Sequence, residues 1–335
     1  MALFGLDIGS ESIKTVQLER KGTEFHLVTA GFTKTHGAGA ASEAEKDLLE
    51  LAESIKELRS EAGIIPIQVV ASLPESLVFT RVIDLPAMTE EEVGQALHWE
   101  LDEIIPIPLE EASFDWQIIN QDQNRVSVFV AVAPKVLINK YLHVFELDQL
   151  QPAALETEVL AIVRALAFTA RQKVKLIVNL GSRSTDIVAT KNDQIILTRS
   201  FPTAGKAITR SVASVLSLEE EVAEEYKKTY GLIPEQVEGK VHQAILPVLE
   251  VISDEIQKSI NFVKEKEKAG TDVVILGGGT ANLPGLSEFI TTRLGTEVQL
   301  ADPFAQLVYD EKLISSLKKL APSFVVAVGL AMREV

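Results

Sequence analysis

The chain has no cysteine and no long uninterrupted apolar run. Without cysteine it cannot form a disulfide framework, a thiol nucleophile or a cysteine-ligated metal site, and the absence fits a reducing compartment. A bilayer span needs roughly 18 to 20 apolar residues, and a secretory signal needs a basic segment before an apolar stretch. Neither pattern is present, so we expect a cytoplasmic protein that does not itself insert into a membrane.

The chain has fewer basic than acidic residues. The sequence has 32 Lys and Arg residues against 48 Asp and Glu residues, which gives a net charge of -16. Nonspecific affinity for nucleic acid depends on Lys and Arg displacing counterions from phosphates, so this balance excludes nucleic acid as a partner. The histidines lack metal-ligand spacing and predict no zinc site. They are His26, His36, His98, His143 and His242.

Two common catalytic signatures are missing as well. No Gly-x-Ser-x-Gly elbow and no Gly-x4-Gly-Lys-Ser/Thr loop occurs, which excludes the α/β-hydrolase and P-loop classes. What is present is a chain of 335 residues with 46% hydrophobic and 24% charged residues. Because domains usually run roughly 100 to 200 residues, this composition predicts two globular domains.

A strand, a Gly-Ser turn and a second strand occur twice along the chain. The first copy covers Leu3 to Leu18 and the second covers Lys175 to Thr190. The segments 6–14 and 178–186 share the pattern acid or amide, apolar, Gly, Ser, any residue, Ser. Strands and helices alternate elsewhere, as in α/β proteins. The repeat therefore predicts a duplicated α/β domain.

A Gly-Ser hairpin tip suits phosphate, because glycine lets the backbone come close and successive N–H groups and hydroxyls converge there. Two facing tips would clamp a polyphosphate from both sides. Asp7 ends its strand where it can hold the waters of a magnesium ion, and Asn179 occupies the matching position of the second copy. The predicted phosphate-binding residues are Gly9, Ser10, Glu11, Ser12, Lys14, Gly181, Ser182, Arg183 and Ser184.

A third glycine-rich loop, at 277–280, follows an apolar strand. A nucleoside can lie against its bare backbone. On a predicted helix three residues apart, Glu224 can accept from ribose hydroxyls and Lys227 can flank the base. A plain intrahelical ion pair is the alternative interpretation of these two residues. The residues predicted to contact adenosine or ribose are Glu224, Lys227, Gly277, Gly278, Gly279, Thr280 and Leu283.

The pattern changes between Pro74 and about Leu150, which indicates an inserted subdomain. A helix is predicted to open at Thr89 with three glutamates and to end before the Ile-Pro-Ile-Pro run at 105–108. Upstream of the insert, Ser42 and Glu45 match a capping box before an amphipathic run.

These motifs carry a family resemblance. The early Asp-x-Gly-Ser, the second such loop and the late Leu-Gly-Gly-Gly-Thr-Ala-Asn-Leu-Pro-Gly resemble the two phosphate motifs and the adenosine motif of the actin and sugar-kinase superfamily. Within it, the segments 85–92, 99–100 and 105–111 resemble the PilM family of type IV pilus assembly proteins, in the FtsA-like branch. The likeness extends over nearly the whole chain.

The resemblance implies an actin-like two-lobed α/β fold of duplicated ribonuclease H-like domains with an inserted 1C-type subdomain. Lobe 1, with subdomain 1A, would cover 1–168 and contain the insert at about 76–150. Lobe 2, with 2A and 2B, would cover 169–320, and a C-terminal helix at 321–335 would return to lobe 1. ATP and Mg²⁺ would lie in the cleft. The family further implies a scaffold at the cytoplasmic face of the inner membrane that holds the N-terminal tail of PilN in a groove by lobe 1 and contacts pilus motor components.

One position departs from that pattern. Relatives commonly carry Asp where this chain has Asn179, so a charge that would help to hold magnesium or position water is absent. Glu158 is the best remaining candidate to orient an attacking water, with a plain helix-surface carboxylate as the alternative. We expect at most a weak ATPase. A small-molecule phosphotransferase, for which Asp186 is a candidate carboxylate, and a filament protein like FtsA or MreB remain the competing interpretations.

Overall fold

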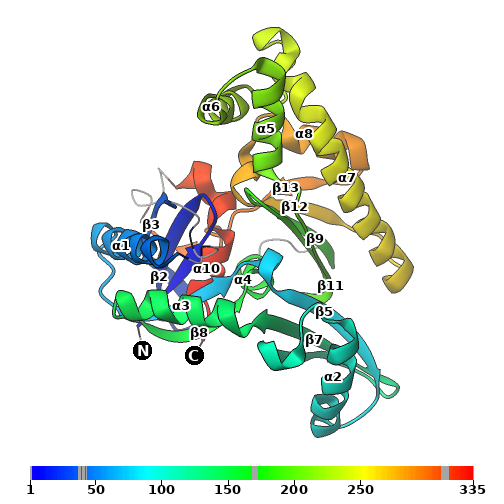
Figure 1. Cartoon of the computed structure of the whole chain (residues 1–335). Coiled ribbons are helices and arrows are strands. Elements are labelled where there is room, and N and C mark those ends of the chain that lie inside the picture. The colour runs from blue at the N-terminus through cyan, green and yellow to red at the C-terminus, as the bar shows by residue number, and fades with distance from the viewer. Residues whose placement is uncertain are drawn as a thin grey trace.

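The computed structural model describes residues 2–36, 39, 42, 44–167, 173–310 and 317–334. Three β-sheets organise these residues, of six, five and three strands. In Figure 1 the six-stranded sheet lies at the left, the five-stranded sheet above it to the right, and the three-stranded sheet at the bottom. We call the parts built on them lobe 1, lobe 2 and the insert subdomain.

Lobe 1 has the strand order β14-β3-β2-β1-β4-β8. The first three strands form an antiparallel meander, and β4, β8 and β14 join in parallel. Helices α1 and α3 share one hydrophobic core with this sheet. The bounds are β1 Leu3–Ile8, β2 Ser12–Lys21, β3 Glu24–Lys34, β4 Gln68–Leu73, β8 Gln151–Thr157, β14 Leu307–Val308, α1 Glu45–Glu61 and α3 Lys135–Leu147.

Lobe 2 has the strand order β11-β10-β9-β12-β13, with the same alternation of an antiparallel meander and two parallel strands. Its helices pack on the sheet in a core of their own. The bounds are β9 Val174–Leu180, β10 Thr185–Lys191, β11 Gln194–Phe201, β12 Val273–Gly277, β13 Val298–Leu300, α5 Gly205–Leu216, α6 Glu220–Tyr230, α7 Lys240–Glu267 and α8 Leu286–Leu294.

The two sheets are copies in topology. Strands β3-β2-β1-β4-β8 of lobe 1 correspond in order and direction to β11-β10-β9-β12-β13 of lobe 2. Strands β9 and β12 are buried at every residue, as expected for central strands that are covered on both faces. The duplication predicted from the repeated Gly-Ser turns is therefore confirmed at the level of the fold.

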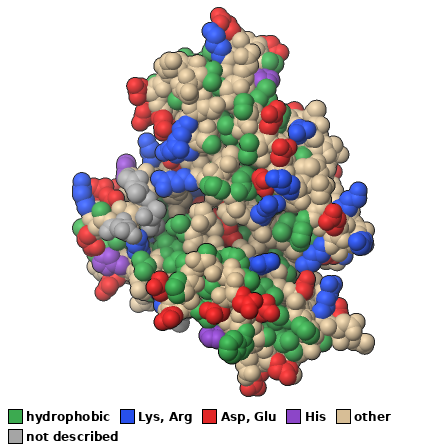
Figure 2. All heavy atoms as spheres, turned by 45° about the vertical axis from the view of Figure 1, so that its right-hand side comes forward, with side chains coloured by type: hydrophobic (Ala, Val, Ile, Leu, Met, Phe, Trp, Pro, Cys, Tyr) green, Lys and Arg blue, Asp and Glu red, His purple; other side chains and the backbone are tan. Residues whose placement is uncertain are grey.

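The insert subdomain lies in the chain between β4 and β8. Its sheet has the order β5-β7-β6, with β5 at Phe79–Pro86, β6 at Ala112–Gln121 and β7 at Arg125–Pro134. Helix α2 at Glu90–Ile104 packs on it through Val93, Leu97 and Leu101. The stretch 82–124 contains no lysine or arginine. Figure 2 accordingly shows acidic and hydrophobic side chains together at the lower end of the molecule, where Figure 1 places α2.

The two predicted helix starts behave differently. At α2 a full capping box forms, because the Thr89 hydroxyl accepts from the backbone N–H of Glu92 and the Glu92 carboxylate accepts from the N–H of Thr89. The capping box predicted at Ser42 is wrong, since α1 begins after Ala44 without a side-chain cap. The Ser42 hydroxyl instead donates to the Asp47 carboxylate at 2.5 Å.

Helices α4 at Glu158–Leu166 and α10 at Val325–Ala331 form the centre of the molecule. Their core contains residues of both large sheets, among them Val16 and Val70 of lobe 1 and Ile177 and Val188 of lobe 2. None of the helices in the described part of the chain has both the length and the apolar character needed to cross a bilayer. The predicted lobe boundaries at 168 and 335 fall on residues outside the described ranges.

Helix α10 lies against α4 at Gly329. A Cβ added there would overlap the carbonyl oxygen of Ala161. Arg164 of α4 fixes the same contact by donating to the Gly329 carbonyl at 2.6 Å and to both oxygens of Glu156, at 2.7 and 2.8 Å. The two helices can approach this closely only because the residue at 329 lacks a side chain.

We therefore expect Gly329→Ala to separate the two helices, at a cost of about 3 kcal/mol or more. Thermal unfolding should show a midpoint at least several degrees below that of the unchanged protein, or loss of soluble protein. Gly270→Ala is the matched control, because nothing lies within 4 Å of a Cβ at that position. Equal midpoints for the two variants would contradict the packing described here.

Candidate nucleotide-binding site

The two Gly-Ser turns are built alike. In each, the glycine N–H donates to the carbonyl three residues later, Gly9 to Ser12 at 3.1 Å and Gly181 to Ser184 at 3.0 Å. Each glycine carbonyl accepts a threonine hydroxyl, from Thr35 at 2.8 Å in lobe 1 and from Thr280 at 2.9 Å in lobe 2. The turn residues Ser10 and Ser12 and their counterparts Ser182 and Ser184 are half-buried. The fold thus presents two matching tips of hydroxyls and N–H groups.

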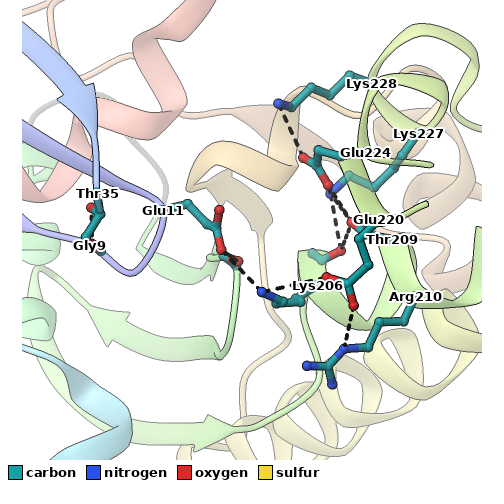
Figure 3. Close-up of polar contacts among 12 residues, drawn as sticks. Gly9, Glu11, Thr35, Lys206, Thr209, Arg210, Glu220, Glu224, Lys227 and Lys228 are labelled. Atoms are coloured by element: carbon teal, nitrogen blue, oxygen red, sulfur yellow. Dashed lines mark hydrogen bonds and ion pairs between the residues drawn. The ribbon is translucent and has the colours of Figure 1, made fainter. Parts of the chain in front are cut away.

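The tips face each other across the cleft between the lobes. The Ser182 hydroxyl donates to the Glu11 carboxylate at 3.4 Å, and the Lys206 ammonium group of α5 lies 3.8 Å from the same oxygen. Lys206 also lies 3.9 Å from Glu220, which pairs with Arg210 at 3.5 Å (Figure 3). Glu11 therefore reaches from the first turn to lobe 2, and Lys206 and Arg210 bring positive charge to the mouth of the cleft.

The third glycine-rich loop lies beside the second turn. Gly278 has a φ of +83°, and a Cβ there would overlap the backbone of Leu180 at the end of β9. Nothing lies within 4 Å of a Cβ at Gly279, so that backbone is open. Thr280 joins the loop to the second turn through its bond to Gly181. Leu283, by contrast, is 6% exposed in the core of lobe 2 and offers a ligand little surface.

Glu224 and Lys227 of α6 form part of a network rather than an isolated pair. The Lys227 ammonium group donates to Glu224 at 2.6 Å, to the Thr209 hydroxyl at 3.0 Å and to the Gly205 carbonyl at 3.2 Å (Figure 3). Thr209 also donates to Glu224. Lys227 is buried with its three donors used, and it holds α5 and α6 together. The second Glu224 oxygen pairs with exposed Lys228 at 3.4 Å and remains within reach of solvent.

Each large sheet has an acidic residue in the hairpin next to its Gly-Ser turn. Asp7 is opposite Lys14 in the β1–β2 register, and the two side chains form an ion pair at 3.2 Å. The matching pair in lobe 2 is Asn179 and Asp186. Asn179 thus occupies the position that Asp7 has in lobe 1, and Asp186 occupies the position of Lys14 on the neighbouring strand. Burial raises the pKa of the Asp186 carboxyl to about 6, against hydrogen bonds that lower it.

Two further carboxyl groups join Asp7 and Asp186. Burial raises the pKa of Glu158, the first residue of α4, well above its usual range, and the charges of Asp186 and Asp7 add to the shift. Burial also raises the pKa of Glu75 to about 8, against the hydrogen bond from the Thr80 hydroxyl. Glu158 is half-buried, and the charges of Asp7, Asp186 and Glu75 act on it, so it is not a plain helix-surface carboxylate.

Unpaired polar atoms accompany this cluster. One oxygen of Glu75, the Tyr141 hydroxyl and the Thr157 hydroxyl are buried without a hydrogen-bond partner. Burial raises the pKa of Tyr141, and the charges of Glu158 and Asp7 contribute to the same shift. Buried polar groups normally have partners, so the cluster has bonding capacity that the protein alone does not use.

From the sequence, neither Glu75 nor Tyr141 is a predicted site residue, and Asp186 is a candidate only for a phosphotransferase. Glu75 follows directly after the central parallel strand β4, at the strand end where ligands of α/β sheets bind. Asp186 occupies the position of Lys14 when the two copies are aligned. Tyr141 had no signal, because it lies on the buried face of α3 among core residues such as Leu137, Val144 and Phe145. Arg183, which was predicted, is exposed at the second turn.

This donor set fits a magnesium nucleotide. Two turns and two cations suit phosphate oxygens, the open Gly279 backbone suits a nucleoside, and a group of close carboxylates suits the waters of Mg²⁺. Among residues 2–36, 39, 42, 44–167, 173–310 and 317–334, no three His, Cys, Asp or Glu side chains lie close enough to hold a metal directly. These carboxylates could therefore hold Mg²⁺ through its bound waters.

Comparisons with known proteins define the class. The chain is 29% identical, with a TM-score of 0.86, to a chain of the solved PilM–PilN type IV pilus biogenesis complex, covering 99% of this chain and 98% of that one. The ethanolamine utilization protein EutJ from Carboxydothermus hydrogenoformans is 18% identical with a TM-score of 0.62, over 99% and 89%. The cell division protein FtsA of Streptococcus pneumoniae is 22% identical over 89% of this chain and 75% of its own length.

The protein is thus of the actin-like class, with two duplicated α/β lobes and an inserted subdomain, as the resemblance implied. The description "Type IV pilus assembly protein PilM" belongs to the family profile that matches residues 5–335. The chain belongs to this PilM family.

The raised pKa of Glu75 gives stability a pH dependence. Between the usual pKa of 4.5 and about 8, the folded protein holds a proton that the unfolded chain has lost. The free energy of unfolding must therefore fall as the pH rises through this window, by about 1.4 kcal/mol per unit of pKa shift at most. Without nucleotide and divalent cations, Glu75→Gln should lose less stability than the unchanged protein between pH 5 and pH 8.

Thermal unfolding at several pH values measures this difference. Glu91→Gln, at an exposed position of α2, is the control and should follow the unchanged protein. Three parallel curves would show that Glu75 is not protonated in the folded state.

Proposed function

We propose that this chain is an ATP-binding scaffold of the type IV pilus assembly machinery, and that it binds the N-terminal cytoplasmic tail of a PilN-like inner-membrane protein. Its membership of the PilM family and its similarity to a chain of the PilM–PilN complex support the assembly role. The observation that carries nucleotide binding is the pair of matching Gly-Ser turns that face each other across the cleft.

In this proposal ATP lies between the turns with its base toward the 277–280 loop and α6. The phosphates accept from the turn N–H groups and hydroxyls, with Lys206 nearby. Asp7 contacts the waters of Mg²⁺. Glu224 accepts from the ribose hydroxyls through the oxygen that faces solvent, while Lys227 has a positioning role because its donors are used within the protein.

ATP is then a structural ligand that fixes the angle between the lobes, and turnover is slow. Asn179 leaves the second phosphate turn without the acid expected there, although Asp186 and Glu158 supply carboxylates nearby. A bound ATP that bridges two lobes stabilises the folded state by mass action. No contact among the described residues specifically favours a phosphotransferase or a filament protein.

Mg-ATP should therefore raise the thermal midpoint of the protein by several degrees, and ATP with EDTA should raise it less. Asp7→Asn should reduce the contribution of Mg²⁺, because it removes the carboxylate nearest Lys14 and the first turn. Asp254→Asn removes a carboxylate on the far side of lobe 2, where Asp254 pairs with Arg293, and serves as the control. An unchanged midpoint of the unmodified protein with saturating Mg-ATP would rule out ATP as its structural ligand.

A groove of about 980 Å³ separates lobe 1 from the insert subdomain. Two sheet edges border it, since β8 is an edge strand of the lobe 1 sheet and β6 is an edge strand of the insert sheet. Arg20, Glu156, Arg164 and Arg333 are among its charged lining residues. Apolar lining residues include Leu73, Val78, Phe129, Ile138, Leu155 and Leu160.

An extended peptide suits this groove. Apolar side chains can enter it while the peptide backbone pairs with a sheet edge. We assign the PilN-like tail to this groove, which agrees with the groove by lobe 1 that the family resemblance implied. The chain would then reside in the cytoplasm and be held at the inner face of the membrane through this partner.

Blocking the groove should abolish tail binding without affecting ATP. Ser113 of β6 is exposed and lines the groove, so Ser113→Trp adds bulk there at little cost to the core. We expect at least about a tenfold loss of affinity for a synthetic tail peptide, or about 1.4 kcal/mol. Gln121→Trp, at the exposed far end of β6, is the control. Fluorescence anisotropy with a labelled peptide measures both, and equal affinity for the two variants would place the peptide elsewhere.

A further inference from the structure

The outer side of helix α2 carries the most exposed aromatic side chain among the described residues. Trp99 is 77% exposed, against 52% for Phe32, the next in order. An α-helix turns about 100° per residue, so Trp99 lies on the side of α2 opposite to the buried residues Leu97 and Leu101. Tryptophan is normally well buried in folded proteins and is enriched in the energetically important parts of protein interfaces. Its exposure here therefore indicates a surface that a partner covers.

Two carboxylates accompany this ring. Asp102 and Glu103 follow Trp99 by three and four residues, which places them on the same side of the helix, and both are exposed. They belong to the last turn of α2, which has no basic residue. Because the C-terminal end of a helix carries partial negative charge, it favours cations and disfavours acids. Asp102 and Glu103 therefore repel the helix end to which they belong.

The other end of α2 has the charges that a helix favours. Its first turn holds Glu90, Glu91 and Glu92, where negative charge suits the positive end of the helix, and Glu92 completes the capping box. The acids at the start of α2 thus stabilise it, whereas the acids at its end do not. A sequence that departs from its own local preference at one place is expected to do so for a functional reason.

No described lysine or arginine compensates these acids. The stretch 82–124 contains neither residue type. In the described residues of 79–134, the ion pairs are Asp122–Arg125 and Asp84–Lys266. Neither pair includes a residue of α2, so Asp102 and Glu103 have no Lys or Arg partner within the part of the chain that the structure describes. Figure 2 shows the result as acidic and hydrophobic side chains together at the lower end of the molecule.

This surface is separate from both proposed sites. The described residues that line the groove include Phe114 and Trp116 of β6 but none of α2. The cleft is formed by the Gly-Ser turns and by α5 and α6. The outer side of α2 is thus a third surface, and what binds there is independent of the proposed function.

We propose that the outer side of α2 binds an arginine-bearing basic segment of a partner protein, and that the guanidinium group stacks on the Trp99 ring and pairs with Asp102 and Glu103. A guanidinium suits both contacts, because it is planar, stacks on aromatic faces and donates through a rigid fork to carboxylates. A lysine ammonium group is instead a compact and strongly hydrated charge. A second copy of this chain fits less well, since each copy has a net charge of -16 and two copies repel each other.

The probe is a blocked hexa-arginine peptide, titrated into the full chain at low salt and followed by calorimetry. We expect saturable binding that Trp99→Ala weakens by about fivefold or more, as for the loss of a central aromatic contact. Asp102→Asn combined with Glu103→Gln should also weaken it. The matched control is Glu57→Gln combined with Glu61→Gln, which removes two exposed carboxylates from α1 and should leave the affinity close to that of the unchanged protein. Hexa-lysine should bind the unchanged protein more weakly, because lysine lacks the planar fork.

Thermal unfolding checks that the variants fold, and the loss of Asp102 and Glu103 should not lower the midpoint, since it removes repulsion at the helix end. Equal losses of affinity in the two double variants would show that the peptide follows only the net charge, and would overturn the site. Absence of binding to the unchanged protein, or binding that Trp99→Ala leaves unaltered, would overturn it as well. Equal affinity for hexa-lysine would overturn the role of the guanidinium group. If sedimentation shows a dimer that Trp99→Ala dissociates, a second copy occupies this surface and the basic partner is wrong.

Discussion

The close packing of α4 on α10 is the constraint on which the rest of the molecule depends. Gly329 lets the two backbones meet, and the resulting pair of helices is the core that both large sheets share. Helix α4 begins at Glu158, one turn before this contact. Its first residue, Glu158, therefore enters the cleft at the place where Asp7 and Asp186 approach from the two sheets. The helix pair thus joins the two large sheets, and one of its helices begins with an acid of the cleft.

The cleft combines an attraction at its mouth with a group of carboxyl groups of raised pKa in its interior. Glu11 bonds Ser182 and faces Lys206 across the mouth, so the lobes are linked there without any ligand. Deeper in the cleft, buried carboxyl groups raise one another's pKa and leave polar atoms unpaired. In the proposed function, a magnesium nucleotide would supply phosphates for the mouth and positive charge for the interior, and its binding would then depend on the angle between the lobes.

Local patterns gave reliable predictions where their partners are close in sequence. The helix start at Thr89 and both Gly-Ser turns depend on residues close in sequence, and they are present. The box predicted at Ser42 is absent, because α1 begins after Ala44 and Ser42 does not occupy the N-cap position. Lys227 lies on a helix, as predicted. Its ammonium group donates to Thr209 and Gly205 of α5, so it has a structural role and is not free to flank a base.

The sequence by itself determined the duplication, the family and the turns that face the cleft, because each is written as a short pattern repeated along the chain. Only the tertiary structure decided which acids share the cleft. Glu75, Glu158 and Asp186 lie far apart in sequence, and each is unremarkable on its own. Burial in one cleft makes them a cluster, since a carboxylate's pKa depends on the charges and solvent around it.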